Sequence, residues 1–142
     1  MVTHTTARLL LRPLEPADAA SITALIAEWD VIRWLTRPPY PYVDSDAEAF
    51  IAHVANKAPD DPDLYCAVTL AGALIGIVNL DQRSRGMNLG YWLGKPYWGH
   101  GYMTEAAMAL TAHFFAIRRD PAITSGHLSG NEASANVLQK LG

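Results

Sequence analysis

One stretch organises the chain: Gly90-Tyr-Trp-Leu-Gly-Lys-Pro-Tyr-Trp-Gly-His-Gly-Tyr-Met-Thr-Glu-Ala106. It begins with the pattern of a strand that ends between Gly94 and Pro96, and a helical pattern begins at Tyr102. A loop with two glycines, Gly99-His100-Gly101, lies between them. Glycines let a backbone approach a ligand closely, and the N–H groups of the first helical turn have no partner within the helix. The stretch therefore predicts a phosphate-binding site, with a tight turn that binds nothing as the alternative.

The residues upstream predict a strand followed by two helices. Arg8 to Pro13 has the pattern of a short buried strand that a proline ends. Apolar side chains spaced one or three residues apart predict an amphipathic helix from Glu15 to Trp29. Three prolines between Arg37 and Tyr42 exclude a helix there. A second helix is expected to begin near Asp44 or Ser45 and to end by Pro59.

Three antiparallel strands are predicted next. The apolar runs Leu64–Leu70 and Ala73–Leu80 flank the dipeptide Ala71-Gly72, which is a hairpin signal. The second run is apolar throughout, so we expect it in the middle of the sheet. A polar turn from Asp81 to Gly86 then leads to the third strand, from Met87 to Leu93.

The remaining elements complete an α+β pattern. We expect a helix from Tyr102 to Ile117, a weaker strand from Ala122 to Leu128, and a last helix that Asn131 caps. Gly90, within the third strand of the hairpin unit, is a candidate bulge site. The order β-α-α-β-β-β-α-β-α predicts a mixed, mostly antiparallel sheet flanked by helices, with one parallel connection.

Composition narrows the class of protein. The chain has 142 residues and a formal net charge of −3. This length fits one domain with its own core, and this charge gives no strong attraction to nucleic acid or to an anionic membrane. No apolar run approaches the length of a membrane span, and the N-terminus lacks the pattern of a signal peptide. The single cysteine, Cys66, excludes an internal disulfide and fits a cytoplasmic protein. The five histidines show no ligand spacing, so we expect no metal site.

Three motifs, in order along the chain, resemble those of the GNAT N-acetyltransferase superfamily. They are Tyr91-Trp-Leu-Gly94, Tyr97-Trp-Gly-His-Gly-Tyr-Met-Thr-Glu-Ala106 and Gly130-Asn-Glu-Ala-Ser-Ala-Asn-Val-Leu-Gln-Lys-Leu-Gly142. The branch they resemble is that of the ribosomal-protein N-terminal (Rim-type) acetyltransferases, which the opening Arg8-Leu-Leu-Leu-Arg-Pro-Leu-Glu-Pro-Ala-Asp18 also fits. The resemblance spans nearly the whole chain.

The resemblance implies that acetyl-CoA is the acetyl donor. It places the CoA pyrophosphate on the backbone of the glycine loop and the pantetheine arm along the preceding strand and against Asn131, for which a helix cap alone is the alternative. The donor-binding residues so implied are Tyr91, Trp92, Leu93, Trp98, Gly99, His100, Gly101, Tyr102, Met103, Thr104 and Asn131. Trp34, Tyr40 and Asn88 are implied as acceptor-site residues. Core packing is the alternative for the two aromatic side chains, and an exposed or hydrogen-bonded amide without a role is the alternative for Asn88.

The chain departs from the family pattern in three places. Pro96 occupies the position of a Gln or Arg at the head of the glycine motif, which matters little because the backbone does the binding. Asn88 occupies a position where this branch often carries an acidic residue, so an obvious general base is missing. Leu138 occupies the position of a tyrosine that many relatives use as a general acid.

These departures favour one class of acceptor. An amine must be neutral to attack a thioester, and at pH 7 deprotonation costs about 1 kcal/mol for an α-amine but about 4.6 kcal/mol for a lysine. For an α-amine a water chain can take the proton, and backbone N–H groups near Leu93 can stabilise the oxyanion. The favoured acceptor is therefore a protein N-terminal α-amine. We expect Ser134 to protonate the leaving thiolate, with a merely satisfied helix hydroxyl as the alternative.

Other functions remain open at this level. A small amine such as a polyamine or an aminoglycoside is the second choice of acceptor. A catalytically dead acyl-CoA-binding module and a structural protein without a ligand are alternatives from other classes.

The sequence stops at Gly142, where relatives continue with two more strands. We therefore expect residues 1–142 to form a single GNAT domain without its C-terminal strands. A longer chain, a clipped chain and a second protomer that fills the gap in a homodimer are the three explanations.

Overall fold

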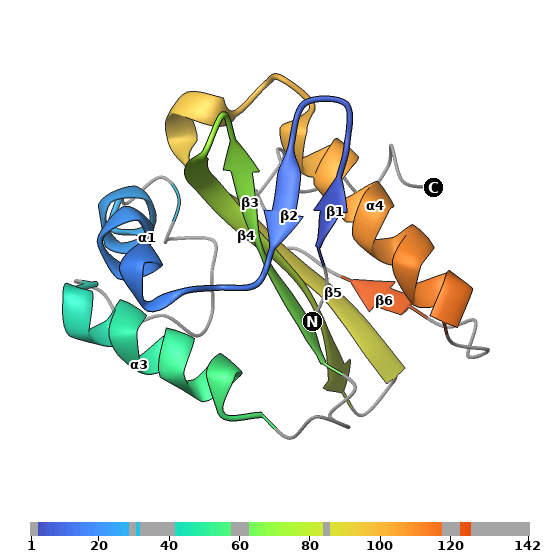
Figure 1. Ribbon diagram of the computed structural model, residues 1–142, viewed down its shortest axis with the longest axis horizontal. Helices are drawn as coiled ribbons and strands as arrows, with labels where there is room; N and C mark the ends of the chain where they lie inside the picture. Colours follow the sequence, from blue (N-terminus) through green and yellow to red (C-terminus); the bar gives the residue numbers. More distant parts are fainter. Residues whose placement is uncertain are drawn as a thin grey trace.

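A mixed sheet forms the centre of the molecule (Figure 1). The computed structural model describes residues 3–28, 31, 42–57, 63–83, 86–117 and 123–125. Within these residues six strands follow one another across the sheet in chain order. They are β1 (His4–Thr5), β2 (Leu10–Arg12), β3 (Leu64–Leu70), β4 (Ala73–Arg83), β5 (Gly86–Leu93) and β6 (Ile123–Ser125). Every neighbouring pair is antiparallel except β5 and β6, which are parallel. The predicted α+β class and the single parallel connection are confirmed.

Helices cover both faces of the sheet (Figure 1). The 3-10 helix η1 (Pro16–Asp18) and the helices α1 (Ala19–Ile26) and α3 (Asp44–Ala55) lie on one face, and α4 (Tyr102–Ile117) lies on the other. Strand side chains divide between two cores: Leu74 and Ile77 pack with residues of α1 and α3, whereas Val78 and Leu80 pack with residues of α4. The apolar run in β4 is thus explained by burial on both faces, as expected of a central strand.

The turn between β3 and β4 has the predicted hairpin geometry. Ala71 and Gly72 have φ angles of 51° and 87°, the left-handed pair that a two-residue type I′ turn requires. Farther along, Val68 pairs with Gly76 but Thr69 pairs with Leu74, so Ile75 is an extra residue in β4. This bulge bends β4 beside the end of β5.

Several sequence-based boundaries were wrong. No bulge occurs at Gly90, which pairs regularly with Asn79. The Cβ of an alanine there would lie 3.0 Å from the amide of the Asn79 side chain, which would have to shift. The turn expected from Asp81 to Gly86 is mostly strand, because β4 runs on to Arg83 and β5 starts at Gly86. Polar residues can occupy a strand there, because pairing with the neighbouring strand determines the backbone conformation.

The N-terminal elements also differ from expectation. The strand expected over Arg8–Pro13 is shorter, and β1 precedes it as an unpredicted partner. The helix expected from Glu15 to Trp29 begins as η1 and its regular part, α1, ends at Ile26. The start differs because the Asp18 carboxylate accepts the Glu15 N–H at 2.7 Å and holds the first turn tighter.

The other elements agree with the sequence. The helices over Asp44–Ala55 and Tyr102–Ile117 are confirmed, and β6 falls within the strand expected over Ala122–Leu128. The last helix, from Asn131, lies outside the described residues. Among the described helices, none has the length and apolar character needed to span a membrane.

Cys66 is fully buried in β3, where burial raises the pKa of its thiol to about 11. The thiol is therefore protonated at neutral pH, and a protonated thiol is a poor nucleophile.

Candidate functional site

The glycine loop joins β5 to α4 through the short 3-10 helix η2 (Lys95–Tyr97). Gly99 and Gly101 have φ angles of 82° and 79°, a region that side chains with a Cβ rarely adopt. A Cβ at Gly99 would meet no atom within 4 Å, so the need for glycine there is conformational rather than steric. The loop therefore has the backbone geometry that its sequence predicts.

A row of free N–H donors follows the loop. The first hydrogen bond of α4 runs from the Glu105 N–H to the Gly101 carbonyl at 3.1 Å. Within the described part of the chain, the N–H groups of Gly101, Tyr102, Met103 and Thr104 have no acceptor. Met103 is buried in the core, which fixes the orientation of this first turn. Such a row of oriented donors attracts an anion.

The loop is tied to the sheet at its beginning. The Gly94 N–H donates to the carbonyl of the bulged residue Ile75 at 2.8 Å, and the Tyr97 N–H donates to the Gly94 carbonyl at 2.9 Å. The Trp98 indole Nε1–H donates to the Leu93 carbonyl at 2.7 Å. The bulge in β4 therefore helps to end β5 and to start η2.

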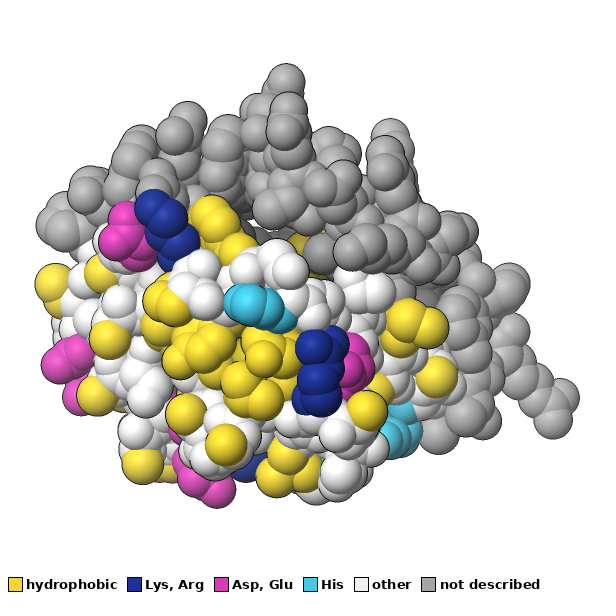
Figure 2. Space-filling view, turned by 90° about the horizontal axis from the view of Figure 1, so that it is seen from above, with side chains coloured by type: hydrophobic (Ala, Val, Ile, Leu, Met, Phe, Trp, Pro, Cys, Tyr) yellow, Lys and Arg dark blue, Asp and Glu magenta, His cyan; other side chains and the backbone are white. Residues whose placement is uncertain are grey.

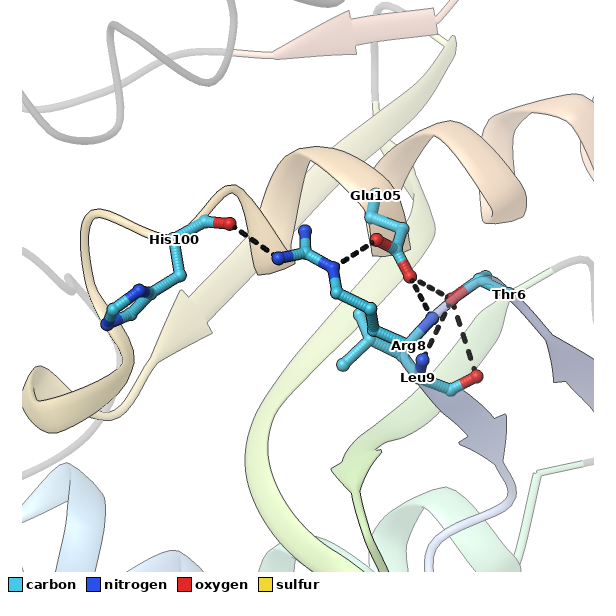
Figure 3. Close-up of polar contacts among 5 residues, drawn as sticks. All are labelled: Thr6, Arg8, Leu9, His100 and Glu105. Carbon is cyan, nitrogen blue, oxygen red and sulfur yellow. Dashed lines mark hydrogen bonds and ion pairs between the residues drawn. The ribbon is translucent and has the colours of Figure 1, made fainter.

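Polar residues of the β1–β2 turn hold the other side of the loop (Figure 3). The Arg8 Nη1–H donates to the His100 carbonyl at 2.9 Å, and its Nε–H donates to Glu105 Oε1 at 2.9 Å. Glu105 Oε2 accepts the Arg8 backbone N–H at 2.9 Å and contacts the Thr6 hydroxyl. That hydroxyl also accepts the Leu9 N–H at 3.0 Å. A single carboxylate thus joins the N-terminal hairpin to the first turn of α4.

The charge of Glu105 is stabilised in this cluster. Burial alone would raise its pKa, but hydrogen bonds from the Thr6 hydroxyl and the Arg8 backbone and side chain outweigh burial, so the pKa lies below its ordinary value. The Arg8 guanidinium also lies 4.6 Å from the centroid of the Tyr102 ring, a cation–π contact. Its side chain remains 45% exposed.

The face around the loop is apolar with a charged rim. Figure 2, which looks onto the end of the sheet where the loop and the hairpin turns lie, shows hydrophobic side chains gathered in the middle of the described surface, with a histidine among them and a basic side chain beside an acidic one at the edge. The partly buried aromatic residues Tyr97, Trp98 and Tyr102 come from the loop region. An apolar surface beside N–H donors suits a ligand that has both a hydrocarbon arm and phosphates.

The strand residues of the predicted site divide between the two faces of β5. Tyr91 and Leu93 pack on the α4 side, and Trp92 packs on the side of α1 and α3. Asn88 is half-buried and lies between Asp81 of β4 and Thr124 of β6 in the strand register. Within the described residues β6 pairs with β5 only from Met87 to Leu89.

The structure brings together one part of the predicted site. The donor-binding residues of β5, the loop and α4 form one continuous segment, with Asn88 farther back along the strand. Trp34, Tyr40, Asn131 and Ser134 lie outside the described residues. No group of three or more His, Cys, Asp or Glu side chains that could hold a metal ion occurs in the described part of the chain.

Comparison with known proteins identifies the family. The sequence model described as an acetyltransferase (GNAT) domain matches residues 8–142. The chain belongs to the GNAT acetyltransferase family. This GNAT protein is 29% identical over 140 residues to YdaF of Bacillus subtilis (strain 168), named as a candidate ribosomal N-acetyltransferase, with 94% of this chain and 76% of YdaF covered. The protein is thus an enzyme of the N-acetyltransferase type, as the sequence predicts.

Solved GNAT structures share its fold. A crystal structure named as a probable acetyltransferase superposes with a TM-score of 0.86 at 25% identity, covering 99% of this chain and 82% of that one. The microcin C7 self-immunity acetyltransferase MccE, solved with acetyl-CoA and AMP, gives a TM-score of 0.83 at 19% identity, covering 96% and 79%. A ribosomal-protein-S5-alanine acetyltransferase from Vibrio fischeri gives 0.82 at 20% identity, covering 100% and 82%. At these two lower identities the likeness concerns the fold alone.

Sequence reasoning missed two residues that hold the glycine loop, Arg8 and Glu105. Both lie within motifs that carried the resemblance, but neither was assigned a role. The available signal was electrostatic: a carboxylate in the first turn of a helix repels an anion bound there unless a nearby cation offsets its charge. The two residues are 97 positions apart in the sequence, so no local pattern indicates their pairing.

Proposed function

We propose that this GNAT enzyme transfers the acetyl group of acetyl-CoA to the N-terminal α-amine of a protein, directly and within a ternary complex. The observation that carries the proposal is the row of N–H groups at Gly101 to Thr104, which have no acceptor among the described residues, in a loop whose Gly99 and Gly101 have positive φ. The donor's pyrophosphate is the anion that we assign to it. MccE, which has the same fold, was solved with acetyl-CoA.

The rest of the donor fits the adjoining surface. The pantetheine arm would run along Tyr91, Trp92 and Leu93 towards the loop, with Asn131 as a further contact. The apolar face seen in Figure 2 offers hydrocarbon contacts beside the phosphate donors. The loop segment Trp98–Thr104 would then bind the donor mainly through its backbone. Pro96, which replaces a Gln or Arg of the family pattern, therefore does not prevent donor binding.

The choice of acceptor follows from proton chemistry and from one relative. Asn88 provides no carboxylate, so an acceptor that is partly neutral near pH 7 is favoured, as an α-amine is. YdaF, the curated relative at 29% identity, is named for ribosomal N-acetylation, which suggests a protein acceptor here.

The reaction needs few protein groups. The neutral amine nitrogen attacks the thioester carbonyl and forms a tetrahedral oxyanion. The amine proton passes to water, and the C–S bond breaks as the carbonyl re-forms. The products are an amide and CoA, whose thiolate Ser134 would protonate. Positioning and N–H donors to the developing oxyanion supply the rate enhancement. An unchanged kcat in Ser134→Ala at saturating acetyl-CoA would remove that role from Ser134.

The acceptor is tested with a matched panel in a CoA-release assay. One peptide has a free α-amine and no lysine, and a second has an acetylated N-terminus and one internal lysine. A polyamine and an aminoglycoside complete the panel. We expect turnover with the first peptide only. Faster turnover of a small amine than of the first peptide would contradict a protein acceptor and identify a small-molecule acetyltransferase.

Donor binding is tested separately by thermal unfolding. A ligand present at 100 times its Kd adds about 2.7 kcal/mol to the free energy of unfolding. Stabilisation by acetyl-CoA with no turnover on any acceptor would identify a dead acyl-CoA-binding module. The absence of any stabilisation would refute the donor site itself.

A further inference from the structure

The peptide unit between His100 and Gly101 has its carbonyl anchored by a side chain from the other end of the sequence. Its oxygen accepts the Arg8 Nη1–H at 2.9 Å (Figure 3). In a planar trans peptide the C=O and N–H bonds point in opposite directions. Holding the His100 oxygen towards Arg8 therefore directs the Gly101 N–H away from Arg8. This N–H is the first donor of the row described above.

This peptide unit would be loosely determined without that anchor. It ends in Gly101, whose φ is 79°, and it follows Gly99, whose φ is 82°. Glycines populate many backbone conformations, so Gly101 offers little resistance to rotation of this peptide unit. His100 itself is exposed and makes no hydrogen bond through its side chain within the described residues. The hydrogen bond from Arg8 is thus the side-chain contact that fixes the orientation of this carbonyl.

Arg8 is in turn fixed by its surroundings. Its Nε–H binds Glu105, which also accepts the Arg8 backbone N–H, and its guanidinium lies over the Tyr102 ring. A guanidinium has a planar fork of donors, which can bind a carboxylate and a carbonyl in one geometry. The Glu105 charge lies next to the Arg8 charge at 2.9 Å and offsets it. The pair therefore acts through geometry rather than through net positive charge.

We propose that Arg8 is a positioning residue for the acetyl donor: it orients the His100–Gly101 peptide unit so that the Gly101 N–H faces the donor's pyrophosphate. This inference rests on the proposed function, because it takes the loop to bind the phosphates of acetyl-CoA. It gives the N-terminal hairpin a part in donor affinity, which it exerts through the glycine loop. Glu105 and Thr6 contribute to the same effect, because they hold Arg8 and the β1–β2 hairpin in place.

Arg8→Lys is the decisive variant, because it keeps the positive charge and removes the fork. Binding is measured by calorimetry with CoA, dephospho-CoA and pantetheine, which removes the acceptor reaction from the readout. We expect the Kd for CoA and for dephospho-CoA to rise about tenfold, which corresponds to about 1.4 kcal/mol. The Kd for pantetheine, which has no pyrophosphate, is expected to stay unchanged. In turnover, KM for acetyl-CoA rises while kcat stays the same.

Two further variants guard against a general folding defect. Lys57→Gln removes another ion pair, with Asp63 at 3.1 Å, and should leave all three dissociation constants unchanged. Glu105→Gln in the Arg8→Lys background should add little to the loss of CoA affinity, because the two residues act as one unit.

Each outcome has a distinct meaning. Wild-type protein that fails to bind CoA refutes the proposed function together with the donor site. Wild-type protein that binds CoA while Arg8→Lys binds it equally well refutes the positioning role alone. Equal weakening of CoA and pantetheine would also refute it, because this is the pattern of general damage. A loss seen with CoA but absent with dephospho-CoA would assign Arg8 to the 3′-phosphate instead of the pyrophosphate.

Discussion

The Trp98 indole nitrogen lies 2.7 Å from the carbonyl oxygen of Leu93 and donates a hydrogen bond to it. The bond spans η2 and closes the segment between the last residue of β5 and the start of the glycine loop. Trp98 also packs against the core on the side of α1 and α3. The strand expected to bind pantetheine and the loop expected to bind pyrophosphate are therefore held together by one side chain.

Trp98→Phe should weaken donor binding more than it weakens the fold. The change keeps most of the packing and removes the hydrogen bond, which costs about 1 kcal/mol of stability. We expect a higher KM for acetyl-CoA from steady-state kinetics, since the loop loses its tie to β5. Phe50→Leu is the matched control, because Phe50 packs against the same core but lies on α3. An equal rise of KM in both variants would contradict this role of Trp98.

Gly99→Ala and Gly72→Ala form a natural comparison. Their φ angles are 82° and 87°, and a Cβ would meet no atom within 4 Å at either position. Each alanine should therefore cost about 1 kcal/mol in the free energy of unfolding, measured by denaturant titration. Only Gly99→Ala should raise KM for acetyl-CoA, because Gly72 belongs to the β3–β4 turn. Equal KM values for acetyl-CoA in the two variants would show that Gly99 does not contribute to donor binding.

Gly76→Ala should disrupt the sheet beside the bulge. A Cβ at this position would lie 2.3 Å from the Trp92 carbonyl oxygen and 3.1 Å from the Leu93 Cα. These are backbone atoms, so relief requires that β4 and β5 separate. We expect a loss of about 3 kcal/mol or more in the free energy of unfolding, as for severe overpacking. A two-state denaturation curve with wild-type stability would show that the strands can shift without cost.

Asp18 makes folding sensitive to acid. It is 5% exposed and accepts two hydrogen bonds from the Arg12 guanidinium, at 2.9 and 2.7 Å. Burial alone would raise the pKa of Asp18, but the bonds from Arg12 and the Glu15 N–H outweigh it and lower the pKa below its ordinary value. The folded carboxylate therefore takes up a proton less readily than the unfolded one. Its contribution is complete well above the unfolded pKa of about 3.9 and is lost as the pH falls through the folded pKa.

Asp18→Asn tests this linkage. The variant should lose about 3 kcal/mol in the free energy of unfolding at pH 7, because it leaves the Arg12 guanidinium with only the longer, exposed ion pair to Glu15 at 3.9 Å. Its stability should also fall less than that of the wild type between pH 5 and pH 2. Unfolding curves recorded across this range measure both effects, and parallel pH profiles would exclude Asp18 as the source.

Local chemistry explains what could be predicted. The Ala71-Gly72 hairpin and the start of α4 at Tyr102 follow from turn residues and helical spacing within a few positions. The glycine loop was recognised because its two glycines and its flanking elements lie within one short stretch. The family was predicted from three short motifs that occur in the expected order along the chain. The match of the acetyltransferase (GNAT) domain model to residues 8–142 confirms this prediction.

Boundaries between polar strands could not be predicted in the same way. Between Asp81 and Gly86 the residues favour a turn, but eight successive pairs between β4 and β5 hold Asp81, Gln82, Arg83 and Gly86 in strand. The extra residue Ile75 is likewise decided by the partner strand β3, whose Val68 and Thr69 face Gly76 and Leu74. Pairing between strands overrides local preference in a sheet.

The sequence by itself therefore determined the order of elements, the glycine loop and the family, because each depends on residues close together in the chain. Only the tertiary structure decided what holds the loop in place. The contacts of Arg8 with His100 and Glu105 join positions 92 and 97 residues apart. They exist because β1 and β2 add to the sheet edge beneath α4, and no local spacing encodes that approach.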